Sequence, residues 1–163
     1  MSFQEYFVHR QCHPSVTGFL FVDAASAQPA PGVIEALQKA DAIVVCPSNP
    51  WVSIGPILSI PGVKSAMHSP VIAVSPIIGG QAVKGPAAKM YMELGFDPTA
   101  LTVAKHYSDL LTGFVLDKED TALAEDVQGM RIMPLVTNTL MHTSEDRGQL
   151  AGEVLKFASS LQS

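Results

Sequence analysis

AIVVCPSNP, residues 42–50, and PVIAVSPIIGG, residues 70–80, are the stretches that decide the fold of this chain. Each contains a short, wholly apolar run that ends in a polar turn built from Pro, Ser, Asn or Gly. A run that is apolar at every position, rather than at every second one, is typical of a strand covered on both faces of a parallel sheet. Two further strands are predicted at 112–117 (TGFVLD) and 130–138 (MRIMPLVTN).

Helices are predicted between these strands and after the last one. Apolar residues at helical spacing, Pro in a first turn and Gly after a last turn mark them. The predicted helical segments are 29–41, 53–67 with a break near Pro61, 84–96, 97–111, 120–129 and 143–161. Strands that alternate with helices imply one α/β domain over residues 1–163, with a parallel-rich, Rossmann-like sheet flanked by helices. Two aromatic stretches, 3–8 (FQEYFV) and 17–23 (TGFLFVD), are also predicted to be strands.

Composition narrows the class of protein. Hydrophobic residues make up 47% of the 163 residues and charged residues 15%, which excludes a disordered chain. The mean hydropathy of +0.25 favours either strands buried on both faces or a surface covered by a partner chain. A net charge of −5 argues against a nucleic-acid ligand. Pro or Gly interrupts each apolar run before the roughly 18 residues of a membrane span, so no membrane partner is expected.

Cysteine content and the first residues predict the compartment. The chain has 2 cysteines, Cys12 and Cys46, which is too few for a disulfide framework. The opening MSFQEYFVHRQ lacks the basic and then apolar layout of a secretory signal. We therefore expect a cytoplasmic protein.

A ligand site is predicted where polar loops follow the two strands, because open α/β sheets bind ligands beyond the carboxyl ends of their strands. Hydroxyls, an amide, helix amino ends, adjacent glycines and a lysine suit a phosphate group. The candidate residues are Ser48, Asn49, Ser53 and Gly55 in the first loop and Gly79, Gly80, Lys84 and Gly85 in the second. The alternative is that these residues only cap helices and turn the chain, and their spacing alone favours that interpretation.

Other polar and aromatic residues leave their roles open. Trp51 could shield a ligand or contact a partner surface, and His106 with Tyr107 could form a stacking or catalytic pair or merely cover a helix. Asp117, Glu119 and Asp120 could hold a divalent ion, but we expect Asp117 to end a strand and Asp120 to cap a helix. No metal site is predicted within this chain.

Long ordered motifs give a resemblance to a known family. ADAIVVCPSNPWVSIGPILSIPGV, VIAVSPIIGGQAVKGPAAKMYMELG and VAKHYSDLLTGFVLD resemble the 2-phospho-L-lactate transferases, called CofD and, in actinobacteria, FbiA. The similarity runs from about Phe3 to Phe157 and corresponds to the C-terminal half of the family fold. The amino-terminal half of that fold, with its Gly-rich nucleotide loop, has no counterpart in these residues.

The resemblance implies a reaction and its ligands. Family members transfer a phospholactyl group, or its enolpyruvyl counterpart, from a GDP-linked donor to the deazaflavin Fo with release of GMP, assisted by Mg²⁺. On this basis the eight loop residues named above would surround the donor phosphates, and the metal ligands would lie in the other half of the fold. We therefore expect this chain alone to be inactive and to act as a homo-oligomer or with a partner chain. Two alternatives are a nucleotide- or nucleotide-sugar-binding regulator of related fold and a dimerising interaction module.

Overall fold

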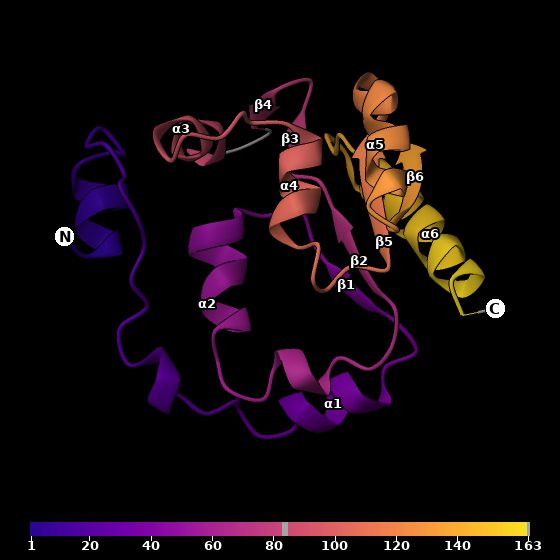
Figure 1. Ribbon diagram of the computed structural model, residues 1–163, viewed down its shortest axis with the longest axis horizontal. Helices are drawn as coiled ribbons and strands as arrows, with labels where there is room; N and C mark the ends of the chain where they lie inside the picture. The colour runs from indigo at the N-terminus through magenta and orange to yellow at the C-terminus, as the bar shows by residue number, and fades with distance from the viewer. Residues whose placement is uncertain (83–84, 163) are drawn as a thin grey trace.

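A four-stranded parallel sheet forms the centre of the computed structural model, which describes residues 1–82 and 85–162 (Figure 1). The strand order is β1-β2-β5-β6. The strands are β1 (Ile43–Val45), β2 (Val71–Val74), β5 (Gly113–Asp117) and β6 (Met133–Thr137). The four predicted strands are therefore confirmed, and so is the α/β, Rossmann-like architecture with parallel pairing throughout this sheet.

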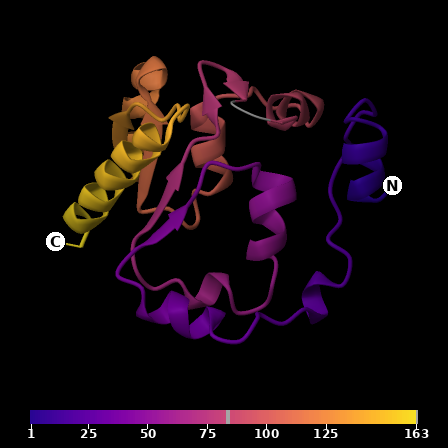
Figure 2. The same ribbon diagram turned by 180° about the vertical axis from the view of Figure 1, so that it is seen from behind.

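Helices cover both faces of the sheet, as the alternating pattern predicts. They are α1 (Val33–Lys39), α2 (Gly55–Leu58), α3 (Ala87–Glu93), α4 (Ala100–His106), α5 (Ala124–Gly129) and α6 (Ser144–Ser160). Side chains of β2 and β5 alternate between the faces, because successive residues of a strand point to opposite sides. Phe114 packs with Val103 of α4 and Val127 of α5 on one face. Val115 packs with Val154 of α6 on the other, where α6 crosses the sheet (Figure 2).

Burial differs between the central and the outer strands. Every residue of β2 and β5 is buried, which confirms the inference drawn from their unbroken apolar runs. In β1, however, Val44 is 39% exposed and Cys46, just beyond the strand, is also exposed. The prediction of a fully buried strand at 42–46 is therefore wrong: β1 is an outer strand of the sheet among the described residues, and the face that carries Val44 is open to solvent.

The predicted strands at 3–8 and 17–23 are also wrong. Residues Glu5–His9 form a single π-helical turn (η1), and residues 17–21 have no regular structure. This segment runs alongside α2 and α3, away from the sheet (Figure 2), so its backbone has no neighbouring strand with which to pair. Its apolar side chains instead pack against helices, as Tyr6 and Val16 do against Met90 of α3.

A short hairpin follows β2 where the sequence predicts only a loop. β3 (Ile77–Ile78) and β4 (Gln81–Ala82) pair antiparallel and are joined by Gly79 and Gly80. Both glycines have positive φ, 55° and 78°, as a two-residue hairpin turn of mirror type requires. No helix of the described residues is long and apolar enough to cross a membrane.

Candidate functional site

The two predicted loops leave the sheet at the same edge. β1 and β2 are parallel neighbours in register from Ile43 with Val71 to Val45 with Ala73, so their carboxyl ends lie side by side. Ser75, directly after β2, is buried; its hydroxyl donates to the carbonyl of Ile77 at 2.7 Å and accepts from the Ile77 amide at 3.1 Å. Ser75 therefore turns the chain from the sheet into the β3–β4 hairpin.

Asn49 organises the first loop through its side chain. Its Oδ1 accepts hydrogen bonds from the amides of Trp51 (2.9 Å) and Val52 (3.2 Å), and its Nδ2 lies 3.2 Å from Sδ of Met90. Asn49 thus caps the short helix η3 (Pro50–Ile54), the structural role that its spacing favours. Phosphate binding by Asn49 stays a prediction, for which the second hydrogen of Nδ2 is the available donor.

The other residues of the first loop differ in what surrounds them. Ser48 and Ser53 are half-buried, and no hydrogen bond to another described residue involves either hydroxyl. Gly55 lies against the segment 17–23, because a Cβ atom there would be 3.0 Å from Cζ of Phe21 and 3.0 Å from the carbonyl oxygen of Pro50. Gly55 is therefore needed for close packing, and the two serine hydroxyls are the groups of this loop suited to an incoming ligand.

Of the two hairpin glycines, Gly79 faces carboxylates, whereas a Cβ atom at Gly80 would lie 3.9 Å from the carbonyl oxygen of Pro98. The amide of Gly79 donates to Oδ2 of Asp120 at 3.1 Å, and a Cβ atom at Gly79 would lie 2.7 Å from Oε2 of Glu119. Gly85 has a φ of 72° and open space around it, whereas Lys84 lies outside the described residues. A diphosphate that used the Gly79 amide would have to replace the Asp120 carboxylate, because two anions do not share one donor without repulsion.

The pKa values of two buried aspartates at this edge, Asp117 and Asp120, are shifted in opposite directions. Burial would raise the pKa of Asp117, but hydrogen bonds from the amide (2.7 Å) and hydroxyl (3.1 Å) of Thr139 and from the Glu119 amide (3.0 Å) outweigh it and hold the pKa below its usual value. Burial raises the pKa of Asp120, and the hydrogen bond from the Gly79 amide lowers it again only in part. The prediction that Asp120 caps a helix is wrong: Asp117 caps the turn Lys118–Leu123 (η5), and Asp120 binds the hairpin.

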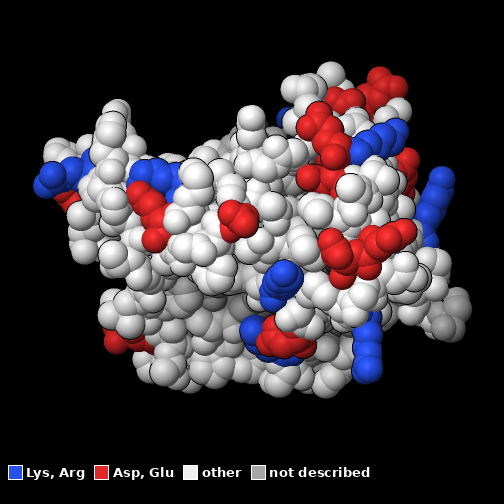
Figure 3. Space-filling model, turned by 45° about the horizontal axis from the view of Figure 1, so that its top comes forward, with Lys and Arg blue, Asp and Glu red and all other residues white. Residues whose placement is uncertain are grey.

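The described residues offer no metal site made of protein side chains alone. They contain no group of three or more His, Cys, Asp or Glu side chains placed to hold a metal ion. Both oxygens of Asp117 already accept hydrogen bonds, and one oxygen of Asp120 is bound to Gly79. Acidic side chains nevertheless gather near α5, while Lys and Arg are scattered over this view of the surface (Figure 3). This edge of the molecule therefore disfavours an anion at the hairpin unless cations from elsewhere neutralise it.

Trp51 and His106, which the sequence singles out separately, lie together. The Trp51 ring centroid is 5.5 Å from that of His106 and 4.3 Å from that of Tyr91, both in edge-to-face arrangements. These rings border a cavity of about 510 Å³. Its lining consists of Trp51, Tyr91, Gly95, Phe96, Asp97, Thr102, Lys105 and His106. No sequence spacing indicates this cavity, because its walls come from three segments that meet only through tertiary packing.

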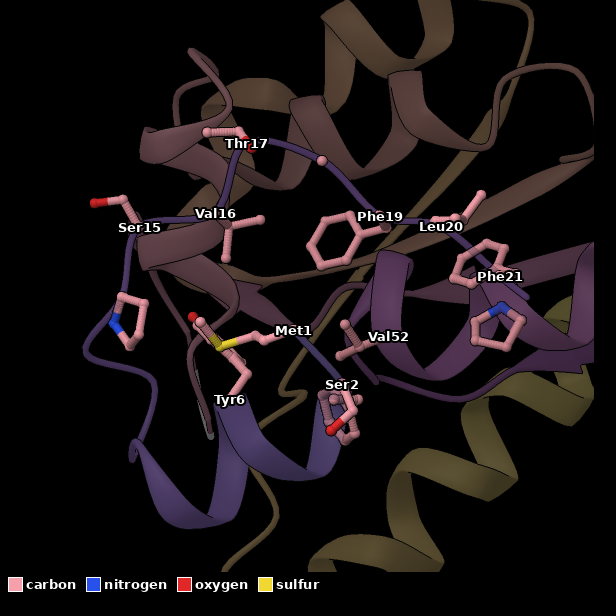
Figure 4. Close-up of a pocket in the computed structure, with 14 residues that line it drawn as sticks. Met1, Ser2, Tyr6, Ser15, Val16, Thr17, Phe19, Leu20, Phe21 and Val52 are labelled. Atoms are coloured by element: carbon pink, nitrogen blue, oxygen red, sulfur yellow. The ribbon is translucent and has the colours of Figure 1, made fainter.

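A second cavity lies on the other side of Trp51. Phe19, which stacks on Trp51 at 5.8 Å, also borders a hollow of about 440 Å³ between the segments 1–6 and 14–21 and residues Val52 and Pro56. The side chains of Met1, Val16 and Phe19 converge on it (Figure 4). The short helix η3, which carries Trp51 and Val52, therefore lies between two cavities that are both lined in part by aromatic side chains.

Comparison with known proteins identifies the family. Residues 1–146 match the family model described as 2-phospho-L-lactate transferase CofD. The chain belongs to the CofD family. Its relatives include a 2-phospho-L-lactate transferase of Methanocaldococcus jannaschii, 33% identical over 99% of this chain and 51% of that protein. A phosphoenolpyruvate transferase of Streptomyces griseus is 38% identical over 98% of this chain and 52% of that protein. A phosphoenolpyruvate transferase of Thermobifida fusca is 40% identical over 98% of this chain and 49% of that protein.

The match to the CofD family covers nearly all of this chain but only part of its relatives. The chain spans about half the length of these curated relatives. Both loops and both cavities fall within residues 1–146, so they belong to the region that the family shares.

Proposed function

We propose that this chain forms part of a transferase that moves a phospholactyl group, or its enolpyruvyl counterpart, from a GDP-linked donor to the deazaflavin Fo. The observation that carries the proposal is membership of the CofD family along almost the whole chain. Relatives carry both names, 2-phospho-L-lactate transferase and phosphoenolpyruvate transferase, so the family assignment leaves both donors open.

The proposed chemistry requires hydrogen-bond donors that position the phosphate groups of the donor. In the proposed reaction the ribityl hydroxyl oxygen of Fo attacks the phosphorus that carries the lactyl or enolpyruvyl group. The bridging P–O bond of the diphosphate breaks, GMP leaves with the bond electrons, and the hydroxyl proton passes to solvent or a base. Such transfers depend mostly on positioning and on neutralising phosphate charge. In this chain the hydroxyls of Ser48 and Ser53, next to the Asn49-capped turn, are the groups we assign to the donor phosphates.

Turnover is proposed to need residues outside this chain. The described residues contain no group of three or more His, Cys, Asp or Glu side chains that could hold Mg²⁺ on their own, and the carboxylate of Asp120 occupies one of the predicted phosphate-binding amides. We therefore expect the purified 163-residue protein to release no GMP from a GDP-linked donor and Fo, under conditions where the M. jannaschii relative does. GMP release by this chain alone would contradict that expectation.

Nucleotide binding provides the direct test of the loop. The double variant Ser48→Ala, Ser53→Ala should weaken GDP binding by roughly tenfold in calorimetry, because each lost hydrogen bond to a charged group contributes about 1.5–3 kcal/mol at most and water compensates in part. Ser65→Ala, an exposed serine that bonds to the Gly62 carbonyl, is the matched control. Equal affinity in both variants would exclude the two serines from the site.

A second candidate function is binding without transfer. The α/β fold with polar loops after β1 and β2 is equally compatible with a nucleotide- or nucleotide-sugar-binding regulator. The same calorimetric titration with a UDP-sugar in place of GDP separates the two functions. Tighter binding of the UDP-sugar would favour the regulator.

A covering partner is also proposed, either a second copy or a separate chain. Large apolar side chains are exposed in the first part of the chain, among them Val8 (64%), Leu20 (86%) and Val22 (76%). Apolar surface of this kind is often covered in a complex. Sedimentation velocity should show a dimer of the purified protein if the partner is a second copy, and a monodisperse monomer would exclude that partner.

A further inference from the structure

The two outer strands of the parallel sheet, β1 and β6, differ in how their free edges are protected (Figure 1). In β6 the amide of Met133 donates to the Thr112 carbonyl at 3.0 Å, on the side of the neighbouring strand β5. Backbone groups of successive residues alternate in direction along a strand, so Pro134 has its nitrogen on the outer edge. Proline has no N–H group, and a proline at this position prevents another strand from pairing fully with the edge.

The free edge of β1 lacks this protection. The amide of Ile43 donates to the Pro70 carbonyl at 2.9 Å, on the β2 side, so the N–H and C=O groups of Val44 point outward. No backbone group of another described element hydrogen-bonds to them. β1 is short, but residues 42–46 contain neither a proline nor a charged side chain. Val44 is 39% exposed and Cys46 is also exposed, so a single copy leaves this edge in solvent.

We propose that this edge is covered by β1 of a second copy of the chain, in an antiparallel pair whose two-fold axis passes beside Val44. The inference rests on the covering partner proposed above, for which it names the surface and the occupant. Unprotected edge strands pair with other strands, and a second copy is the one partner that a purified protein always contains.

The sequence around Val44 is matched to itself. Residues 42–46 read AIVVC, which has the same order of side-chain types in both directions. With Val44 opposite Val44 of the second copy, the β-branched Ile43 lies opposite Val45, and the small Ala42 lies opposite Cys46. Pairs of β-branched residues on neighbouring strands are favourable, and no charged residue within 42–46 opposes a like charge. A strand of unrelated sequence would not require this symmetry, which is why we assign the edge to a second copy.

The expected geometry follows from the antiparallel ladder. A residue whose N–H and C=O groups both face the neighbouring strand exchanges two hydrogen bonds with the residue opposite, at a Cα separation of about 5.5 Å. The two copies of Val44 form this pair, and the two four-stranded sheets join into one. Because the paired strands run in opposite directions, their carboxyl ends point to opposite edges of the joined sheet. Each copy therefore keeps its own first loop, with Ser48, apart from that of the other copy.

Sedimentation velocity over a series of protein concentrations tests the occupant. The wild-type protein should form a dimer. Val44→Lys should raise its dissociation constant by roughly a hundredfold, because two ammonium groups then lie opposite each other across the pair. Met133→Lys, which adds the same charge to an exposed side chain (49%) of β6, is the matched control and should leave the dimer intact. Circular dichroism confirms that both variants are folded.

Two results of this series would overturn the proposal. A wild-type protein that is monomeric at every concentration would exclude the second copy and leave the edge to a separate chain. A dimer that Val44→Lys and Met133→Lys affect equally would place the interface elsewhere, for example on the exposed apolar side chains of residues 1–31.

A disulfide locates the two-fold axis without adding charge. The Cα separation of about 5.5 Å across the Val44 pair lies within the range that a disulfide spans, so Val44→Cys should give a covalent dimer under mild oxidation. The wild-type protein should not, because its exposed Cys46 lies opposite Ala42 rather than opposite itself. Leu155→Cys, at an exposed position (64%) on α6, controls for random oxidation. Equal cross-linking of Val44→Cys and Leu155→Cys would contradict the assigned axis.

These outcomes are separable from the proposed transferase function. GDP binding that depends on Ser48 and Ser53 in a monomeric protein would support the transferase assignment and overturn the self-pairing of β1. A dimer that Val44→Lys dissociates, with GDP affinity indifferent to the two serines, would support the self-pairing and contradict the phosphate loop.

Discussion

Residues 1–31 and residues 42–160 have similarly apolar stretches but fold differently. In the second region, VIAV at 71–74 and GFVLD at 113–117 become fully buried strands. In the first, FQEYF and TGFLF, which are richer in aromatic residues, form one π-helical turn and irregular backbone, with Leu20 86% exposed. Aromatic and β-branched content thus indicates that a segment fits a half-buried surface, whereas a strand also requires a neighbouring strand for its backbone.

The largest expected difference between the two regions is in stability. Phe114→Ala removes a ring with no exposed surface from the centre of the sheet and should lower the free energy of unfolding by about 3–5 kcal/mol. Leu20→Ala, in the first region, should change it by less than about 0.5 kcal/mol because that side chain is already in solvent. Urea titrations followed by circular dichroism measure both. Similar losses in the two variants would mean that residues 1–31 are as well packed as the sheet.

Lowering the pH should reduce the stability of the sheet through protonation of Asp117. Its pKa is lowered in the folded state, so its contribution is present above the unfolded value of about 3.9 and is lost as the pH falls through the folded pKa. Asp117→Asn should cost roughly 1–3 kcal/mol at pH 7, since it replaces one acceptor of the Thr139 and Glu119 hydrogen bonds with a donor. Urea midpoints measured between pH 3 and pH 7 should show a smaller acid loss in the variant.

Asp120→Asn is the control at the same edge. The pKa of Asp120 is raised by burial, so charge at this position opposes folding at neutral pH. An asparagine can still accept the Gly79 amide, and we expect unchanged or slightly increased stability at pH 7. A loss as large as that of Asp117→Asn would show that the Asp120 charge, rather than its hydrogen bond, holds the hairpin.

The smallest expected effect is on hydrogen exchange in residues 1–31, which are held against α3 by Glu93 and Lys89. Glu93 of α3 accepts the Val16 amide at 3.0 Å and pairs with Lys89, which also donates to the Pro14 carbonyl at 3.0 Å. Glu93→Ala should speed hydrogen exchange of amides 14–21 severalfold and leave β2 and β5 unchanged, because local opening costs far less than global unfolding. Glu125→Ala, exposed on α5, is the matched control. Faster exchange throughout the sheet would show that the two regions unfold together.

The sequence pattern correctly predicted the helices and the strands that belong to the parallel sheet. All six helices and the four strands of the parallel sheet follow from periodicity and from signals such as Gly95 after α3. The structure adds a capping box between Thr143 and Asp146 at the start of α6. The same patterns failed at 3–8 and 17–23, where no neighbouring strand exists. They also failed at Asp120, whose partner Gly79 is 41 residues away in sequence.

The amino-acid sequence by itself determined the α/β architecture, the polar turn after β1 and, through long ordered motifs, membership of the CofD family. Only the tertiary structure decided that Asn49 also contacts Met90, that Gly79 faces Asp120, and that Trp51 meets His106 beside a cavity. Periodicity and capping are properties of neighbouring residues along the chain. A side chain's partners and the shape of a cavity depend on which distant segments pack together.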